Sequence, residues 1–151
     1  DFISLDKTTF PTNLALPEPY TNGYIFKNGK FEDNTLSNIS LSWASGSMVS
    51  NAYDLNHWLR GLMQGTTLQN FADLRNKMLT PVASDYGYGV FCGNRIGSCG
   101  TAPGYSTSAF YYKDIKSTVI VMANVSESGK NIADSIAIRI TDKLKQLFAK
   151  E

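Results

Sequence analysis

The hydrophobic period of the 151-residue chain changes within its second half, and this change constrains the fold more than any other feature. Strand-like runs separated by Gly, Pro, Asn and Asp turns are typical of an antiparallel meander. The runs span residues 86–92, 98–102, 106–112 and 118–124. A helical period follows, with apolar residues every three or four positions. These residues are Ile132, Ile136, Ile140, Leu144 and Leu147. Their apolar stripe needs a sheet face to cover, so the predicted fold class is α+β.

The first part of the chain, residues 1–81, is predicted to form loops and short helices, whereas residues 82–151 form the strands and the final helix. Pro11, Pro17 and Pro19 interrupt any long element near the start. Asn28-Gly29 can place both of its residues at positive φ, so we predict a hairpin with a type I′ turn over residues 24–31.

Two helices are predicted before Pro81. Asn51 and Asp54 form a capping box at the start of the first helix, and Gly65 is a natural stop. Its apolar stripe consists of Leu55, Trp58, Leu59 and Leu62. The apolar residues of the second, shorter helix are Leu68, Phe71, Leu74 and Met78. His57 lies off the first stripe, so we expect it on a solvated helix face rather than in a catalytic or metal site.

Charge and hydropathy exclude several functions. The 14 basic and 13 acidic residues give a net charge of +1, which provides no electrostatic surface for nucleic acid or an anionic membrane. No apolar run approaches the roughly 20 residues that cross a bilayer, and the first residues do not resemble a signal peptide. We therefore expect neither a nucleic-acid partner nor a membrane span.

The most informative motif is GSCGTAPGYS at residues 97–106, and other motifs accompany it in order. ASGSMVSNAYDL (residues 44–55) and YGYGV (residues 86–90) precede it, and VIVMAN (residues 119–124) follows it. In this order the motifs resemble those of class C β-lactamases, D-alanyl-D-alanine carboxypeptidases and related esterases, which are penicillin-recognising serine hydrolases. Residues 6–10 and 22–24 also fall where that family has short motifs. The resemblance implies an incomplete β-lactamase-like fold over nearly the whole chain.

The resemblance also implies a role for the central motif. Enzymes of this family acylate a Ser at the start of a helix, while a Lys one turn later and a Tyr act on its proton. A closing strand carries Lys or His, then Thr or Ser, then Gly. Its side chains meet the substrate carboxylate, and the next backbone N–H forms half of the oxyanion hole. Ser98, Cys99 and Gly100 hold the triplet positions, and Thr101 is expected to supply the N–H.

Two residues depart from the family pattern. Ser98 stands in place of Lys or His, which removes a positive or proton-carrying group. Cys99 replaces a hydroxyl donor by a weak thiol donor. Both changes put the substrate preference and the turnover of the enzyme in question. The backbone N–H of Thr101 does not depend on either side chain. The resemblance further implies that Asn124 lies at the rim of the site, near the substrate carboxylate. We also expect Tyr105 to line the cleft, because it lies beside the strand of Ser98.

Two short patterns on this chain match the catalytic motifs of the family, and we interpret both matches as coincidences. Ser4-Leu5-Asp6-Lys7 satisfies Ser-x-x-Lys, but the following residues are a poor continuation of the helix that would bring Lys7 beside Ser4. Tyr20-Thr21-Asn22 satisfies Tyr-x-Asn but occupies the region of a later motif. We therefore expect the catalytic Ser, Lys and Tyr on a segment preceding Asp1, and we expect this chain alone to be inactive.

The resemblance also implies partners. In the family the last strand pairs with a strand from the N-terminal segment, so residues 118–124 would be left as an apolar edge. We expect association with the missing N-terminal segment, or a strand-exchanged homo-oligomer. A peptide, β-lactam or ester is the implied substrate, no cofactor is implied, and the implied location is periplasmic or secreted.

Cys92 and Cys99 flank the predicted turn at residues 93–97, so their sulfurs can face each other across a hairpin. We predict a disulfide in an oxidising compartment, with two free thiols as the alternative. A nucleophilic Cys99 is a more distant alternative, because nothing nearby in the sequence would lower its pKa.

Two other interpretations of the chain stay open. The parent protein can be a non-catalytic binding or scaffold member of the same fold, which the substitution at Ser98 motivates. The chain can also be a free-standing small β-meander domain unrelated to hydrolases. Intact Ser-x-x-Lys and Tyr-x-Asn motifs upstream would favour the enzyme over both.

Overall fold

The computed structural model describes residues 3–12, 16–65 and 71–149. The first half contains β1 (Tyr24–Lys27), β2 (Lys30–Asp33), a 3-10 segment η1 (Ile39–Ser45), α1 (Ala52–Gln64) and α2 (Phe71–Met78). The second half contains β3 (Phe91–Cys92), β4 (Arg95–Ala102), β5 (Tyr105–Tyr112), β6 (Ser117–Ala123), β7 (Val125–Glu127) and α3 (Ile132–Phe148).

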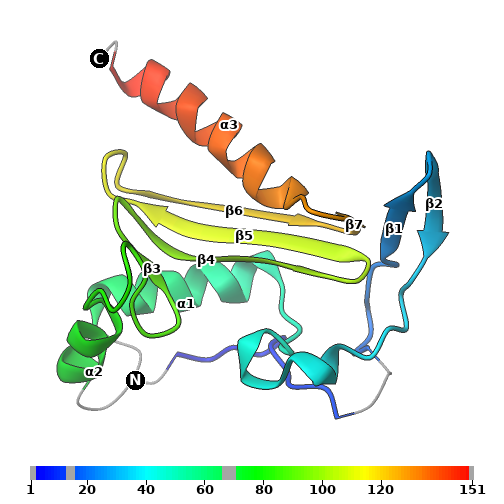
Figure 1. Ribbon diagram of the computed structural model, residues 1–151. Helices are drawn as coiled ribbons and strands as arrows, with labels where there is room; N and C mark the ends of the chain where they lie inside the picture. The colour runs from blue at the N-terminus through cyan, green and yellow to red at the C-terminus, as the bar shows by residue number, and fades with distance from the viewer. Residues whose placement is uncertain (1–2, 13–15, 66–70, 150–151) are drawn as a thin grey trace.

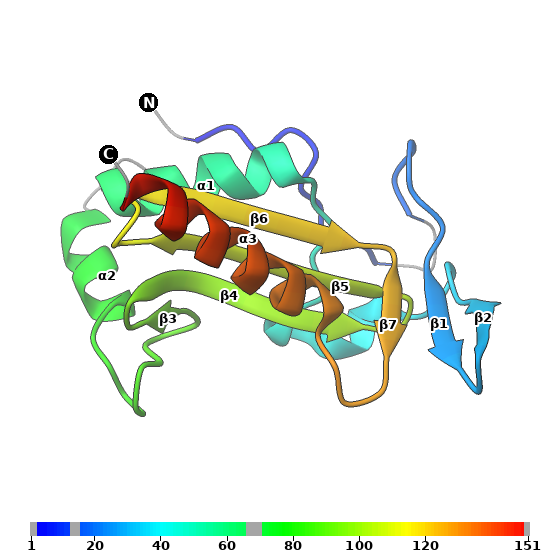
Figure 2. The ribbon, with the colours of Figure 1, turned by 90° about the horizontal axis from the view of Figure 1, so that it is seen from above.

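An antiparallel sheet with the strand order β3-β4-β5-β6 forms the centre of the molecule. Helix α3 crosses one face of this sheet, and α1 lies along the opposite face (Figures 1 and 2). A smaller sheet has the order β2-β1-β7, in which β1 is antiparallel to β2 and parallel to β7. The predicted α+β class, with a meander covered by a C-terminal helix, is confirmed.

Each face of the central sheet has its own apolar cluster. On the α3 side, Phe110, Tyr112 and Val119 pack with Ala137 of the helix. On the α1 side, Ile96 and Val90 pack with Leu62 of that helix. The sheet is therefore a two-sided core, which explains why its strands carry apolar residues on both faces.

Local sequence signals account for several element ends. The φ angles of Asn28 and Gly29 are 52° and 76°, as the predicted type I′ turn requires. Gly65 ends α1 with a φ of 73°, in the left-handed conformation. Asn51 caps α1 by accepting a hydrogen bond of 2.8 Å from the Asp54 backbone N–H.

The Asp54 side chain serves a different purpose from the one predicted. Its carboxylate does not complete the capping box but accepts hydrogen bonds from the Lys7 backbone N–H and the Thr8 hydroxyl, each at 2.8 Å. Asp54 is only 3% exposed, so it ties the start of the chain to α1 from a buried position. This contact spans more than 40 residues of sequence and has no local signal.

The strand predicted over residues 86–92 is shorter than expected, because only Phe91 and Cys92 join the sheet. A turn precedes them, in which the Gly87 backbone N–H donates to the Val90 carbonyl oxygen at 2.8 Å. Gly87 packs so tightly that a Cβ atom there would lie 2.1 Å from the Met78 carbonyl oxygen. The second helix, α2, begins at Phe71, and the predicted Leu68 lies outside the described residues.

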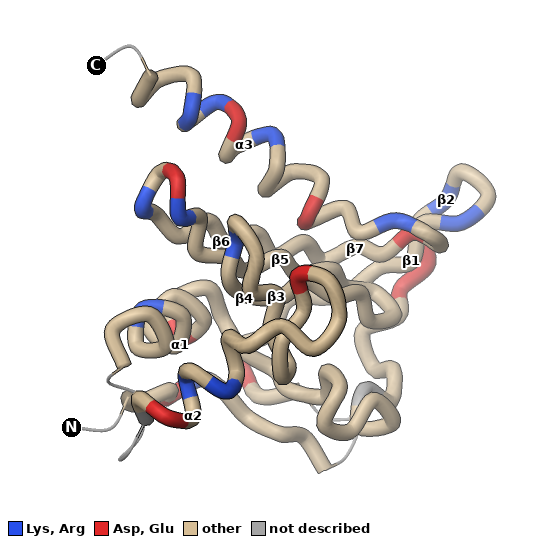
Figure 3. The backbone as a smooth tube through the Cα atoms, turned by 60° about the vertical axis from the view of Figure 1, so that its left-hand side comes forward, with Lys and Arg blue, Asp and Glu red and all other residues tan. Residues whose placement is uncertain are grey.

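Charged residues of both signs are interspersed over the described chain (Figure 3). Within the described ranges, no helix is both long enough and apolar enough to span a membrane.

Candidate active site

One edge of β4 is open to solvent along the predicted motif. Strand β3 pairs only with Ile96 and Gly97, so no described strand covers β4 from Ser98 onward. Ser98, Gly100 and Thr101 are exposed there. The edge therefore offers unpaired main-chain groups that an extended ligand can bind.

Side chains of β4 alternate between the two faces of the sheet. Ile96 packs with α1, so Ser98 and Gly100 face the same side. A Cβ atom built on Gly100 would meet no atom within 4 Å, so there is open space on this side of the strand. Cys99 instead packs with the Phe110 cluster under α3. The motif therefore places Ser98 and Gly100, but not the Cys99 thiol, toward the open space.

The direction of the Thr101 N–H follows from the register of β4 with β5. Hydrogen-bonded and non-hydrogen-bonded pairs alternate along an antiparallel ladder. The Lys113 backbone N–H donates to the Asn94 carbonyl oxygen at 3.2 Å, which marks that pair as hydrogen-bonded. Counting along the continuous register, Thr101 and Ser106 form a non-hydrogen-bonded pair. The Thr101 N–H therefore points away from β5 and toward the open edge.

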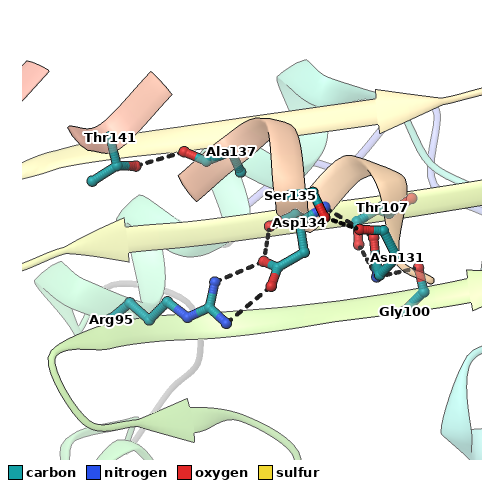
Figure 4. Close-up of polar contacts among 9 residues, drawn as sticks. Arg95, Gly100, Thr107, Asn131, Asp134, Ser135, Ala137 and Thr141 are labelled. Atoms are coloured by element: carbon teal, nitrogen blue, oxygen red, sulfur yellow. Dashed lines mark hydrogen bonds and ion pairs between the residues drawn. The ribbon is translucent and has the colours of Figure 1, made fainter. Parts of the chain in front are cut away.

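Polar side chains fix the first turn of α3 to the face of β4 and β5 that this helix covers, which we call the covered face. Arg95 of β4 donates two hydrogen bonds to Asp134 of α3, at 2.6 and 3.1 Å (Figure 4). The Ser108 hydroxyl donates to the same carboxylate at 2.8 Å, and the Ser106 hydroxyl accepts from the Ala133 backbone N–H at 3.3 Å. The helix start is therefore tied to both strands.

The groups around Asp134 favour the ionised state of its carboxylate. Burial raises the pKa of Asp134, but the hydrogen bonds from Arg95 and Ser108 outweigh burial and hold the pKa of the carboxyl below its ordinary value. The Arg95 guanidinium also lies over the Phe110 ring, 4.0 Å from its centroid. These residues were not singled out from the sequence, because their contacts join segments far apart in the chain.

Tyr105 lies opposite the last residue of β4 and Asn124 follows the end of β6, and both contact one segment of the chain. The Tyr105 hydroxyl donates to the Thr21 carbonyl oxygen at 2.8 Å, and the Asn124 amide donates to the Asn22 carbonyl oxygen at 2.9 Å. A Cβ atom on Gly23 would lie 2.4 Å from the Tyr105 ring, so the ring is packed against this segment. Burial raises the pKa of the Tyr105 hydroxyl. Both side chains hold residues 21–23 in place, and a role in substrate binding stays a prediction.

The predicted disulfide is not present in the structure, where Cys92 and Cys99 are both free. Cys92 pairs with Ile96, whereas Cys99 pairs with Ser108 on the far side of β4, so the two cysteines are not opposite each other. Burial and the nearby Asp134 raise the pKa of the Cys99 thiol, which disfavours the reactive thiolate.

The other candidate groups have contacts of their own. Ser4 and Lys7 are not in a helix, and the Ser4 hydroxyl contacts Asp6 instead. His57 is exposed on α1, as predicted, with its ring edge-on to Tyr53. The residues that the structure describes contain no group of three His, Cys, Asp or Glu side chains that could hold a metal ion.

Comparison with known proteins supports the resemblance seen in the motifs. A family model described as Beta-lactamase matches residues 3–143. A D-stereospecific amidohydrolase from Streptomyces sp. superposes with a TM-score of 0.66 and 30% identity, over 80% of this chain and 40% of that one.

Two further solved structures share the fold at lower identity. A D-amino acid amidase from Ochrobactrum anthropi SV3 has a TM-score of 0.73 and 19% identity, over 97% of this chain and 47% of that one. A penicillin binding protein from Bacillus halodurans has a TM-score of 0.63 and 24% identity, over 95% of this chain and 45% of that one. The chain spans less than half the length of each of these proteins. From the ordered motifs, the covered meander and the match to residues 3–143, we conclude that this chain belongs to the beta-lactamase family of penicillin-recognising serine hydrolases.

Proposed function

We propose that this chain supplies the substrate-binding edge strand and one oxyanion-hole donor of a serine hydrolase that cleaves an amide or ester through an acyl-enzyme. The observation that carries the proposal is the orientation of the Thr101 N–H toward the open edge of β4. A backbone donor on a rigid strand can stabilise the oxyanion that develops when a serine attacks a carbonyl carbon. Open space beside Gly100 leaves room for the substrate.

The nucleophile of this reaction is proposed to lie on a segment preceding Asp1. Residues 4–7, which satisfy Ser-x-x-Lys, form no helix that would bring the Lys7 amine beside the Ser4 hydroxyl. In the proposed reaction a serine on the preceding segment attacks the carbonyl carbon and the amine or alcohol leaves. Water then hydrolyses the acyl-enzyme and restores the serine.

The proposed substrate is an amide or ester without a free carboxylate next to the cleaved bond. Ser98 gives the open edge a neutral hydroxyl where the family resemblance implies a cation, and a neutral group binds a carboxylate less strongly. Two of the structural neighbours are named as a D-stereospecific amidohydrolase and a D-amino acid amidase, which supports amides of D-amino acids as the first substrates to test. D-alanyl-D-alanine carboxypeptidase activity is the alternative within the same family.

Intact mass spectrometry tests the proposal. The chain is incubated with an activated ester of a D-amino acid, first alone and then with the polypeptide encoded immediately upstream. Acylation of a serine in the upstream polypeptide, only in the mixture, is expected. Acylation of this chain alone would contradict the proposed position of the nucleophile.

A second candidate function is a non-catalytic binding or scaffold protein of the same fold. The observation that favours it is the orientation of Cys99, whose thiol faces the α3 core rather than the open side of β4. Binding of a D-amino acid amide without acylation in either sample would support this candidate. A periplasmic or secreted location is likewise a proposal from the resemblance alone, and the two free cysteines give it no support.

A further inference from the structure

The side-chain amide of Asn131 is fully engaged between α3 and the central sheet. Its Oδ1 atom caps α3 by accepting a hydrogen bond of 2.9 Å from the Asp134 backbone N–H. Its Nδ2 atom donates to the Gly100 carbonyl oxygen at 3.0 Å and to the Thr107 carbonyl oxygen at 3.3 Å (Figure 4). The capping residue of α3 therefore also contacts the strand that carries the proposed oxyanion donor.

The contact acts on one particular peptide group. The Gly100 carbonyl and the Thr101 N–H belong to the same peptide, and a trans peptide is planar with its C=O and N–H on opposite sides. In the ladder with β5 the Thr107 N–H donates to the Gly100 oxygen, and Asn131 adds a second donor to this oxygen. The two donors together direct the Thr101 N–H to the open edge. The restraint matters here, because β4 has a strand neighbour on one side only at this point and Gly100 adds backbone freedom.

Asn131 can hold this peptide because its own position is fixed. The next residues of α3 are tied to the sheet by the hydrogen bond from Ala133 to Ser106 and by the contacts of Asp134 with Arg95 and Ser108. These contacts lie on the covered face, away from the open space beside Gly100. Asn131 therefore supports the peptide from behind without contacting the substrate side.

We propose that Asn131 is a positioning residue, which orients the Gly100–Thr101 peptide so that the Thr101 N–H is aimed at the reacting carbonyl oxygen. The catalytic part of this inference rests on the proposed function. Because a small misplacement of an aligned group costs up to about 100-fold in rate, loss of the Nδ2 donor should slow acylation by about 10-fold to 100-fold. Substrate binding should change little, so kcat should fall while KM stays within about threefold.

The variants Asn131→Ser and Asn131→Asp separate this role from helix capping. Ser and Asp cap helices about as well as Asn, but neither carries the Nδ2 donor. Asn51→Ser is the matched control, because Asn51 caps α1 through the same kind of contact to Asp54. Circular dichroism of each variant checks that the helices are retained.

The first measurement is independent of activity and uses NMR of the chain. Loss of a hydrogen bond to the Gly100 oxygen should shift the Gly100 carbonyl ¹³C and the Thr101 amide ¹⁵N in both Asn131 variants, but not in Asn51→Ser. Unchanged shifts at both nuclei would overturn the proposal.

The second measurement compares acylation in the mixture with the upstream polypeptide. A fall in kcat in both Asn131 variants, with KM retained and with Asn51→Ser unaffected, supports the proposal. Shifted NMR signals with unchanged acylation would overturn the positioning role. If the unmodified mixture is not acylated, the proposed function fails, and the NMR shifts alone then decide whether Asn131 orients the peptide.

Discussion

Two glycines of β4 lie three residues apart but differ in the space around them. Gly97 has a φ of 146°, and a Cβ atom there would lie 2.1 Å from the Ala109 carbonyl oxygen. Gly100 has open space around the same position. We expect Gly97→Ala to lower the free energy of unfolding by about 2 kcal/mol or more, because both backbone strain and a steric clash result. Gly100→Ala should cost less than about 1 kcal/mol. Urea unfolding checks both, and equal losses would contradict the tight packing at Gly97.

The neutral side chain of Ser98 leads to a prediction about specificity. Ser98→Lys places an ammonium group on the open side of β4, where it can bind a carboxylate. In the mixture with the upstream polypeptide, we expect KM for a substrate with a free carboxylate to fall by about tenfold, which corresponds to about 1.4 kcal/mol. KM for an amide substrate should stay within about twofold. Steady-state kinetics with the matched pair of substrates decide this, and equal changes for both would count against the proposed substrate class.

At the level of elements, the pairing of Arg95 with Asp134 joins β4 to α3 and makes their association depend on pH. The pKa of Asp134 is lowered in the folded chain, so its contribution to stability is fully present above the unfolded pKa of about 3.9 and is lost as the pH falls through the folded value. Asp134→Asn should therefore lower the free energy of unfolding at pH 7 by about 1 to 3 kcal/mol.

The difference in the free energy of unfolding between Asp134→Asn and the unmodified chain should be smaller at acidic pH than at pH 7. Urea unfolding at pH 7 and at acidic pH measures this difference. Asp114→Asn is the control, because Asp114 also has a lowered pKa beside Lys145 but is exposed. A smaller loss is expected for this variant. Equal losses at neutral and acidic pH for Asp134→Asn would show that the ionised carboxylate is not what joins the two elements.

Elements with a local signal could be predicted from the sequence, and those with a non-local cause could not. Asn28-Gly29 sets the hairpin, and Asn51 and Gly65 set the ends of α1, because each acts within one turn of the chain. The strand expected from residue 86 is interrupted where Gly87 packs on the Met78 carbonyl, a contact that no periodicity reports. The disulfide prediction failed for the same kind of reason, since it depended on the register of β3 with β4.

For the candidate site, the ordered motifs predicted the strand that carries the site residues. The contacts that support this strand come from the fold. Ser98, Gly100 and Thr101 lie on an open edge, which agrees with the expected place of the motif. The sequence did not single out Asn131, which caps α3 by accepting a hydrogen bond from the Asp134 backbone N–H. Its contact with Gly100 could not be predicted, because the contact requires α3 to cross the sheet at one particular position.

The whole molecule has a second open edge, along β6. Pairing alternates across β5, so the residues of β5 that bond to β6 are those not bonded to β4. It follows that the N–H groups of Val119 and Val121 point toward β5. Those of Thr118, Ile120 and Met122 point outward, where no described strand pairs with them. Such an edge is a template for pairing with another chain.

We therefore expect the upstream polypeptide to add a strand at this edge of β6. In hydrogen exchange followed by NMR, the amides of Thr118, Ile120 and Met122 should exchange rapidly in the chain alone and slowly in the mixture. Val119 is the internal control, because its N–H is already bonded to β5 and should change little. Slow exchange that appears with rising concentration of the chain alone, together with a dimeric elution volume, would indicate strand exchange between copies. Rapid exchange of the three outward amides in the mixture would contradict pairing at this edge, because a strand added there must use those N–H groups.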